Sequence, residues 1–358
     1  MSTPAPNTLE ILENVPLAPY TTLGVGGPAK LFASVIGEAD VRTALRRAGD
    51  EGLPVFVLGG GSNLLVSDRG WPGMVIRMAR RGIVMRSADR HIILTAAAGE
   101  EWDALVARSV AENCAGLECM SGIPGTAGGT PVQNVGAYGQ EVSETISQVR
   151  AIEISSGKIH EFSGVECGFA YRTSRFNQQD QGRFVILSVS FRLRPGAWPR
   201  VQYPDLQRHF AGGAKHPTLQ QVRDAVREIR RSKAMLLEAG DADSHSAGSF
   251  FKNPILPRIQ YEELANVAAQ RDLRPPPAYP AGAGTVKVAA GWLVEHAGVT
   301  KGFTLGHAGI SSKHALAIVN RGDATAAEIF ALKNLVQQRV RDAFGVELIP
   351  EPVLLGAF

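Results

Sequence analysis

Hydrophobic residues in the first half of the chain gather in short runs, each bounded by glycine, proline or charged residues. Runs of this length predict strands, and they lie at 31–35, 54–58, 74–78, 83–87, 91–99 and 183–194, with a hairpin at 149–162. Two helices are expected, near 40–50 and at 101–114, because apolar residues recur there at helical spacing. The first of these helices ends at Gly52. The apolar face of the second comprises Trp102, Leu105, Val106 and Val110.

The second half opens, after a turn-like PGAWPR segment at 195–200 that suggests a boundary, with a helical pattern over 218–233. Thr218 is of a type that favours a helix N-cap. The apolar positions that follow it at helical spacing are Leu219, Val222, Val226 and Ile229. Residues 271–284 are rich in proline and glycine, and they predict a loop.

The clearest helical pattern of the chain covers 325–344. Asp323 or Thr325 is expected to open this helix and Gly345 to close it, since these residue types favour the two kinds of cap. A strand-like segment, 346–356, follows. Together the elements predict an α+β fold whose first half carries a mixed or antiparallel sheet.

Composition and charge narrow the class of protein. With 358 residues, 44% of them hydrophobic and 20% charged, the chain is globular and long enough for two or three domains. The net charge of +3 is too small for a dedicated nucleic-acid binder. Cys114, Cys119 and Cys167 match no zinc spacing and are expected to be reduced thiols. The histidines form no pair at metal-ligand spacing, so no metal site is predicted.

Features of secreted and membrane proteins are not predicted. The N-terminal segment has no basic start followed by an apolar core, so we expect no signal peptide. No uninterrupted apolar run reaches the roughly 18 residues that a membrane helix needs. A soluble, cytoplasmic protein is therefore expected.

Glycine-rich motifs carry the candidate chemistry. Gly24, Gly26 and Ala29 satisfy a loose dinucleotide pattern, but Pro28 interrupts it and a strand follows where a helix is required, which argues against a Rossmann site. At 59–63 a buried strand runs into GGGSN, whose backbone N–H groups can face one oxyanion. Without the lysine of a P-loop, this segment predicts either a tight structural turn or a diphosphate cradle.

Segment 121–139, SGIPGTAGGTPVQNVGAYG, is the densest of these motifs. Its glycines allow the backbone to approach a ligand closely, and its prolines stiffen the loop. The side chains of Gln133 and Asn134 can read a heterocycle or a phosphate. Ligand binding is the interpretation we favour, because a plain connection rarely needs so many constraints.

These motifs occur in a recognisable order. YTTLGVGGPAKLF, GGGSNLLV, the 121–139 segment, YRTSRF, SAGSFFKNP, AGWLVEHAG and FGVELIPEP follow one another as in the UDP-N-acetylenolpyruvoylglucosamine reductases, which the chain resembles over roughly 20–356. The resemblance implies non-covalent FAD, NADPH as hydride donor and UDP-N-acetylglucosamine-enolpyruvate as the small-molecule substrate. No nucleic acid or membrane partner is implied.

The resemblance also implies a domain organisation. An N-terminal extension (1–19) would precede an FAD-binding domain (20–200) of the p-cresol methylhydroxylase and vanillyl-alcohol oxidase type, with two α+β subdomains that meet near residue 70. A substrate-binding α+β domain (215–335) and a closing segment (336–358) that returns to the active site would complete the chain.

Site residues follow by family position. Arg172 would meet the enolpyruvyl carboxylate, Ser249 would donate a proton, and Glu351 would be the third catalytic residue. The residues implied to line FAD are Gly59, Gly60, Gly61, Ser62, Asn63, Ser121, Gly122, Ile123, Gly125, Thr126 and Ile186. Those implied to bind the substrate are Tyr138, Tyr203, Lys233 and Asn253.

Two other functions fit parts of the sequence. A flavin oxidase of the same wider fold would need neither the Ser249 motif nor the strand of Glu351, and it often carries a covalent flavin, for which no clear His or Cys motif is present. A non-enzymatic nucleotide-binding module is the other alternative, and a colourless purified protein would favour it.

Overall fold

The computed structural model describes residues 9–213, 216–238 and 240–358, so the first eight residues of the predicted N-terminal extension lie outside it. The described chain divides into two compact units, each discontinuous in sequence. The first unit contains the described residues up to 15 together with 29–61 and 71–232. The second contains 16–28, 62–70 and the described part of 233–358.

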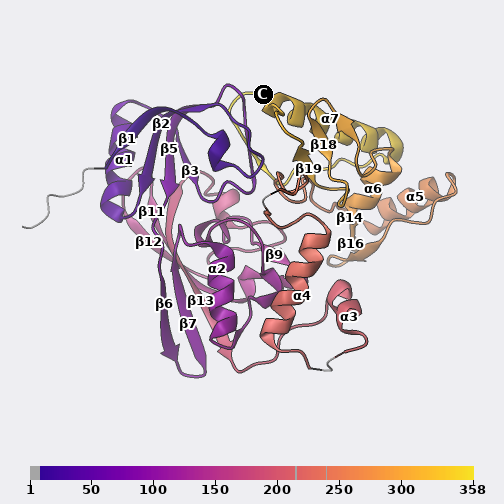
Figure 1. Ribbon diagram of the computed structural model, residues 1–358, viewed down its shortest axis with the longest axis horizontal. Coiled ribbons are helices and arrows are strands. Elements are labelled where there is room, and N and C mark those ends of the chain that lie inside the picture. The colour runs from indigo at the N-terminus through magenta and orange to yellow at the C-terminus, as the bar shows by residue number, and fades with distance from the viewer. Residues whose placement is uncertain (1–8, 214–215, 239) are drawn as a thin grey trace, which may run out of the picture. The chain divides into compact units, whose positions relative to one another are not determined.

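The first sheet of the first unit has four strands (Figure 1). Its order is β1 (Ile11–Pro16), β2 (Pro28–Val35), β5 (Trp71–Met78) and β3 (Val55–Leu58). Strands β2 and β3 both pair with β5 in parallel. The crossover between them is α1 (Glu38–Asp50), which buries Val41, Ala44 and Ala48 and gives way to Gly52 in the left-handed region.

An antiparallel sheet forms the other half of this unit. Its order is β12 (Ile159–Ser163), β11 (Ile146–Glu153), β13 (Phe184–Pro195), β7 (His91–Ala97) and β6 (Ile83–Ala88), with β8 (Cys114–Ala115) paired to the end of β13. Helix α2 (Trp102–Ala111) buries Trp102, Leu105, Val106 and Val110, as predicted. The Trp102 ring lies 5.7 Å from that of Phe191 on β13, and this contact joins the helix to the sheet.

Further helices of the first unit follow the long strand. Helix α3 (Pro204–Phe210) leads to α4 (Leu219–Ser232), which packs beside α2 (Figure 1). The remaining short elements are β9 (Gly136–Ala137), β10 (Gln140–Glu141) and the 3-10 turns Glu118–Met120, Ala127–Gly129, Val142–Glu144 and Arg175–Asn177.

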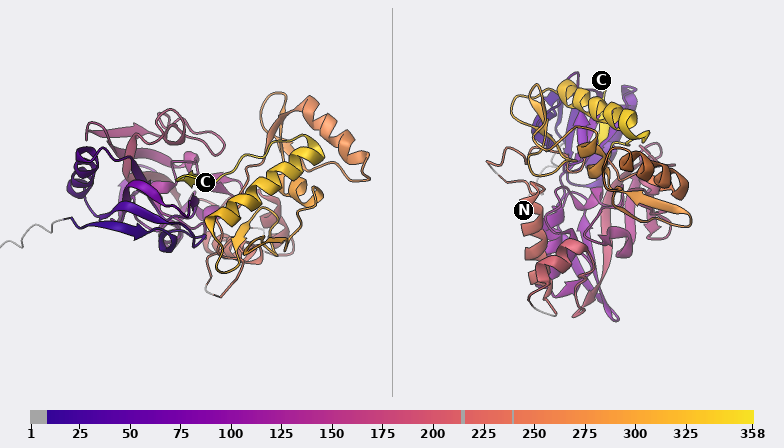
Figure 2. Two further views of the ribbon diagram at one scale, coloured as in Figure 1. Left: turned by 90° about the horizontal axis from the view of Figure 1, so that it is seen from above. Right: turned by 90° about the vertical axis from the view of Figure 1, so that its right-hand side faces the viewer.

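The described part of the second unit contains three small sheets and three α-helices. The strands pair as β14 (Ile255–Pro257), β16 (Thr285–Val288) and β15 (Ala278–Pro280); as β17 (Thr304–Leu305), β18 (Ala308–Ile310) and β19 (Ile318–Asn320); and as β4 (Leu64–Val66) and β20 (Val353–Leu355). The helices are α5 (Arg258–Ala269), α6 (Ala290–His296) and α7 (Ala326–Phe344), after an initial 3-10 turn at Ala18–Tyr20. Helix α7, the long yellow helix in Figure 2, packs against α6, β18 and β19.

Most elements of the first half were predicted correctly, and the differences lie mainly in the second. Strand β15 lies inside the predicted loop 271–284, where it pairs only with β16, an edge position that tolerates Pro280. Only β20 is regular within the strand-like 346–356. Helices α3, α5 and α6 are short or weakly patterned, and the sequence did not predict them.

The expected domain limits also differ from the compact units. Helix α4, expected in the substrate-binding domain, belongs to the first unit. Helix α7 runs without a break across the limit proposed between 335 and 336. The PGAWPR segment at 195–200 lies within the first unit.

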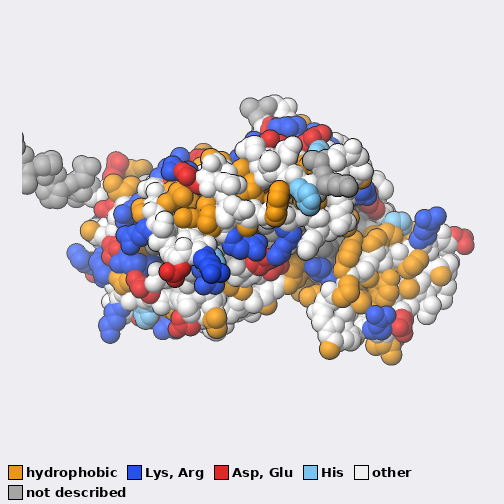
Figure 3. Space-filling model, turned by 90° about the horizontal axis from the view of Figure 1, so that it is seen from below, with side chains coloured by type: hydrophobic (Ala, Val, Ile, Leu, Met, Phe, Trp, Pro, Cys, Tyr) orange, Lys and Arg blue, Asp and Glu red, His pale blue; other side chains and the backbone are white. Residues whose placement is uncertain are grey.

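Charge is distributed without a dominant sign on the face in Figure 3, where basic and acidic side chains are interspersed. Among the described residues, no helix is both long and apolar enough to cross a membrane. Within the same ranges, no cluster of three His, Cys, Asp or Glu side chains is placed to hold a metal ion.

Helix α7 begins with a double cap. Of the two predicted openers, Thr325 is the N-cap: its hydroxyl accepts the Glu328 N–H at 3.1 Å, whereas Asp323 precedes the helix at φ +56°. Asp68, distant in sequence, accepts the N–H groups of Ala326 and Ala327 at 2.8 and 2.9 Å. The side chains of Thr325 and Asp68 thus satisfy donors that the first turn of a helix leaves open.

We expect Asp68→Ala to lower the free energy of unfolding by about 0.5–2 kcal/mol, the usual cost of a lost N-terminal cap. Urea unfolding followed by circular dichroism measures it. Asp323→Asn removes the same charge near the helix without touching either cap, and it should shift the midpoint little. Equal shifts for both variants would mean that charge, not the two hydrogen bonds, stabilises α7.

Candidate active site

Two glycine-rich segments of the first unit approach each other main chain to main chain. A Cβ atom added to Gly60 would lie 2.6 Å from Cα of Gly125, and one added to Gly59 would lie 2.9 Å from the hydroxyl oxygen of Thr126. Only glycine allows this approach without a shift of the backbone. The segment after β3 and the 121–129 segment therefore form one continuous loop surface.

The second of these segments is fastened to the antiparallel sheet and to α2. The Gly125 carbonyl accepts the Trp102 N–H at 3.1 Å, and the Gly128 N–H donates to the Ala98 carbonyl at 2.9 Å. Ser121 is fully buried, and its hydroxyl donates to the Glu118 carbonyl at 2.6 Å. Nearby, Ile186 on β13 is buried and pairs with β11.

One polar atom of this surface is unsatisfied. The hydroxyl oxygen of Thr126 is buried and has no hydrogen-bond partner within the described ranges of the chain. Buried polar groups normally have a partner, from the protein, water or a ligand. A glycine-lined loop surface beside an unsatisfied hydroxyl fits the diphosphate of a dinucleotide cofactor such as FAD.

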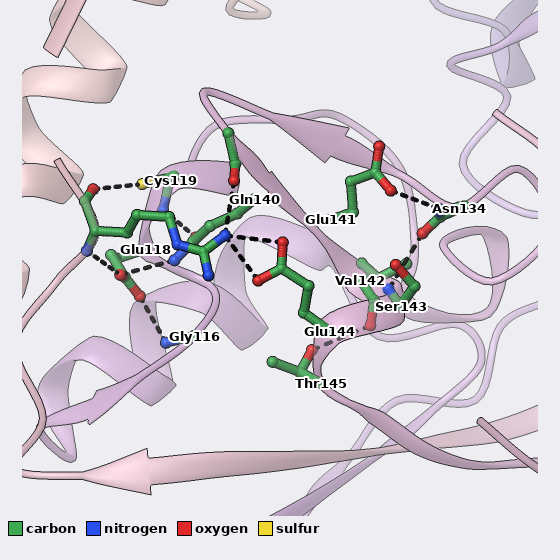
Figure 4. A network of polar contacts seen from close by, with 12 residues as sticks. Gly116, Glu118, Cys119, Asn134, Gln140, Glu141, Val142, Ser143, Glu144 and Thr145 are labelled. Atoms are coloured by element: carbon green, nitrogen blue, oxygen red, sulfur yellow. Dashed lines mark hydrogen bonds and ion pairs between the residues drawn. The ribbon is translucent and has the colours of Figure 1, made fainter. Parts of the chain in front are cut away.

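A polar network holds the turn before this segment (Figure 4). The buried Glu118 carboxylate accepts the Gly116 N–H at 2.7 Å, the Gln140 side-chain amide at 2.8 Å and the Arg200 N–H at 3.1 Å. Gln140 in turn accepts the Cys119 N–H at 2.8 Å. These bonds tie together chain segments far apart in sequence, so the loop is rigid at its base.

Asn134 serves this network rather than a ligand. Its amide nitrogen donates to Glu141 at 2.7 Å, and its amide oxygen accepts the Ser143 N–H at 3.1 Å (Figure 4). The amide nitrogen also donates to the Ala170 carbonyl at 3.0 Å. With both ends of the amide engaged, the expectation that Asn134 reads a heterocycle is not supported.

Arg172 occupies a turn of unusual backbone geometry. Its φ is +54°, which is uncommon for a residue other than glycine, and the turn is closed by the pair Ala170 and Thr173. The guanidinium donates to the Gly136 carbonyl at 3.0 Å, at the far end of the glycine-rich segment. Backbone held in this region is often found at functional sites.

Tyr138 and Tyr203 form an aromatic pair. Their ring centroids are 5.4 Å apart in an edge-to-face arrangement, which aromatic rings prefer. Burial raises the pKa of Tyr138 to about 12, so its hydroxyl stays protonated at neutral pH. Tyr203 is the N-cap residue of α3 and is 41% exposed. The structure thus brings two of the predicted substrate residues together.

In the second unit, the segments that carry Ser249 and Glu351 lie side by side. The Glu351 N–H donates to the Phe250 carbonyl at 2.8 Å, and the Lys252 N–H donates to the Ile349 carbonyl at 2.9 Å. The side chain of Asn63 donates to the Glu351 carbonyl at 3.1 Å. A candidate cofactor residue therefore holds the main chain of a candidate catalytic one.

The other predicted residues lie at helix ends. Asn253 accepts the Ala290 N–H at 2.9 Å through its amide oxygen, at the start of α6. Lys233 directly follows α4 and belongs to the second unit. Arg172 belongs to the first unit, whereas Ser249 and Glu351 belong to the second.

Comparisons with known proteins find the same family that the sequence motifs indicate. The family model described as UDP-N-acetylenolpyruvoylglucosamine reductase, C-terminal domain, matches residues 240–355, and an FAD binding domain model matches 29–163. The chain is 45% identical to the Thermobifida fusca protein named UDP-N-acetylenolpyruvoylglucosamine reductase, over 98% of this chain and 99% of that one. A Nocardia farcinica protein of the same name is 46% identical over 97% and 90%.

A solved structure gives the same picture. The crystal structure of the reductase from Thermus caldophilus aligns with a TM-score of 0.65 and 25% identity, covering 98% of this chain and 99% of that one.

We expect Gly60→Ala to lower the FAD content of the purified protein, because the added Cβ would have to displace the main chain at Gly125. Gly49→Ala is the matched control, since a Cβ there meets nothing within 4 Å. The ratio of flavin to protein absorbance measures the difference. Full flavin content in the Gly60 variant would mean that FAD does not bind beside the contact between Gly60 and Gly125.

Proposed function

The chain belongs to the UDP-N-acetylenolpyruvoylglucosamine reductase family, and from this we propose that it reduces UDP-N-acetylglucosamine-enolpyruvate to UDP-N-acetylmuramate in the cytoplasm, with NADPH as the electron donor. Membership makes the chain an FAD-dependent oxidoreductase of peptidoglycan synthesis with a UDP-sugar substrate. The observation that carries the proposal is the pairing of the Ser249 and Glu351 segments in the second unit.

The loop surface formed by the two glycine-rich segments supports the assignment of FAD as the cofactor. Residues 59–61 and 121–126 would hold the FAD diphosphate through backbone N–H groups, and the Thr126 hydroxyl would gain its missing partner there. When bound, FAD supplies the hydride transfer between NADPH and the substrate.

Arg172 suits the carboxylate of the substrate. Reduction of the conjugated double bond builds negative charge on that carboxylate, and a guanidinium fork can stabilise this charge by donating two parallel hydrogen bonds to it. The bond from Arg172 to the Gly136 carbonyl and the strained turn orient the fork before substrate arrives. Such preorganised groups typically lower a barrier by a few kcal/mol.

Ser249 and Glu351 would complete the addition. After hydride reaches the terminal carbon, the neighbouring carbon carries an electron pair that must take a proton. Ser249, next to Gly248 at φ +73°, would donate it, and Glu351 would act on the carboxylate side of the same intermediate. Tyr138, Tyr203, Lys233 and Asn253 would bind the UDP-sugar.

An anaerobic visible spectrum tests the whole proposal. Flavin absorbance should bleach on addition of NADPH and recover on addition of UDP-N-acetylglucosamine-enolpyruvate. A flavin that NADPH bleaches but only oxygen restores would favour an oxidase instead.

Arg172→Lys keeps the charge but loses the fork, so the change is not conservative at a carboxylate site. We expect turnover to fall at least about tenfold, equivalent to about 1.4 kcal/mol, with FAD still bound. Steady-state rates and flavin content measure the two effects. Near-normal turnover of the variant would mean that Arg172 does not bind the substrate carboxylate.

Ser249→Ala separates the two half-reactions, because only the second needs the proton. Anaerobic stopped-flow should show nearly normal flavin reduction by NADPH, whereas reoxidation by the enolpyruvyl substrate should slow by about 10²-fold or more, the scale of a lost general acid. Ser249→Cys, which retains a proton, should recover part of the rate. Equal slowing of both half-reactions would make Ser249 a structural or binding residue.

A further inference from the structure

Arg230, in the last turn of α4, is a buried charged group that the proposed mechanism does not use. We infer that Arg230 is a positioning residue that couples the candidate FAD segment 121–126 to the candidate substrate tyrosine, Tyr138. The inference rests on the proposed function, and it adds that cofactor binding and substrate binding depend on one guanidinium.

The burial of Arg230 requires an explanation. The residue is only 9% exposed, and burying a charged guanidinium is costly unless its N–H groups are hydrogen-bonded. Burial lowers the pKa of Arg230, while the hydroxyl of Tyr138 and the carboxylate of Asp103 oppose this shift. A fork with several fixed donors can serve two partners at once, which a lysine ammonium does poorly.

The first partner of Arg230 lies in the FAD segment. Its Nε donates to the Gly122 carbonyl at 3.2 Å. From the other side, the Gly122 N–H donates to Asp103 Oδ1 at 2.6 Å. Gly122 has φ +72°, so its backbone is held at both polar groups in a conformation that favours glycine.

Asp103 also fixes the helix that carries Arg230. Its carboxylate accepts hydrogen bonds from both terminal nitrogens of Arg223, at 2.6 and 2.8 Å, and from one terminal nitrogen of Arg227 at 2.6 Å. Burial alone would raise the pKa of Asp103, but the hydrogen bonds from Arg223 and Gly122 outweigh it and lower the pKa. The ionised carboxylate therefore fastens α4 to α2 and sets the position of Arg230.

The second partner is Tyr138, whose ring packs against the apolar residues Val222, Ala225 and Val226 of α4. The Arg230 guanidinium counteracts the rise that burial causes in the pKa of the Tyr138 hydroxyl. Tyr138 is itself held at φ +48° and packs edge-to-face on Tyr203. The guanidinium thus connects the Gly122 carbonyl to the tyrosine pair. A ligand that shifts either Gly122 or Tyr138 would therefore also shift the Arg230 guanidinium, and with it the other of these two residues.

Four variants of the full-length protein test this. Arg230→Lys removes the shared fork, and Tyr138→Phe removes only the hydroxyl and keeps the ring against Tyr203. Asp103→Asn weakens the bond to the Gly122 N–H and also the ion pairs that position Arg230. Arg231→Lys, at the exposed neighbouring position on α4, is the matched control. The dissociation constant of FAD from the apoprotein, KM for the enolpyruvyl substrate, kcat and the thermal midpoint are measured for each.

We expect Arg230→Lys to raise both the FAD dissociation constant and KM at least about fivefold, with kcat changed less than about threefold, since a fork is replaced by a point charge. Tyr138→Phe should raise only KM and Arg231→Lys neither constant, whereas Asp103→Asn, which loosens both Gly122 and the position of Arg230, should raise both. In the double variant Arg230→Lys/Tyr138→Phe, KM should rise less than the product of the single effects, as for residues that share one interaction.

Two results would overturn the inference. If Arg230→Lys lowers the thermal midpoint but leaves the FAD constant and KM as in Arg231→Lys, Arg230 only anchors the helix. If the effects of Arg230→Lys and Tyr138→Phe on KM multiply in full, the two residues act independently. Failure of the wild-type protein to turn over the enolpyruvyl substrate would overturn the proposed function alone, because the FAD constants are measured without it.

Discussion

The contact between the main chains at Gly60 and Gly125 is the constraint on which the first unit depends. It fixes how closely the end of β3 can approach the segment that runs from Ser121 to the 127–129 turn. Helix α2, the hydrogen bonds of the buried Glu118, and Asp103 with its arginine partners hold this segment and the turn before it in place. The glycines supply the space and the polar side chains supply the rigidity, so neither alone would make a cofactor cradle.

A second constraint organises the other unit. The closing chain returns to residues 62–70, where β20 pairs with β4 in parallel, and Asn63 bonds to the main chain of Glu351. The same closing chain pairs with the segment that follows Ser249. Two hydrogen bonds, one from the Asn63 side chain and one to the Phe250 carbonyl, therefore set the local position of the Glu351 main chain. Rigid support of this kind suits the catalytic role proposed for Glu351.

The charged residues between α2 and α4 have a structural role, and the proposed coupling of cofactor and substrate binding adds a functional one. Arg230 is buried, whereas the side chains of Asp103 and Arg223 are 30% and 11% exposed, at positions where packed helices usually carry apolar residues. What the charges add is direction, because hydrogen bonds to one peptide group at Gly122 fix its orientation. This specificity is valuable only where a loop must keep one conformation.

The sequence by itself determined the fold class, most elements of the first half, the last helix and the motifs of the family. These follow from periodicity, capping residues such as Thr325 and Gly345, and glycine positions, all of which act locally. Tertiary structure decided the rest. Three features depend on partners tens to hundreds of residues away: the hydrogen bonds of Asn134, the cap that Asp68 supplies to α7 and the burial of Arg230. No local sequence pattern encodes such pairings.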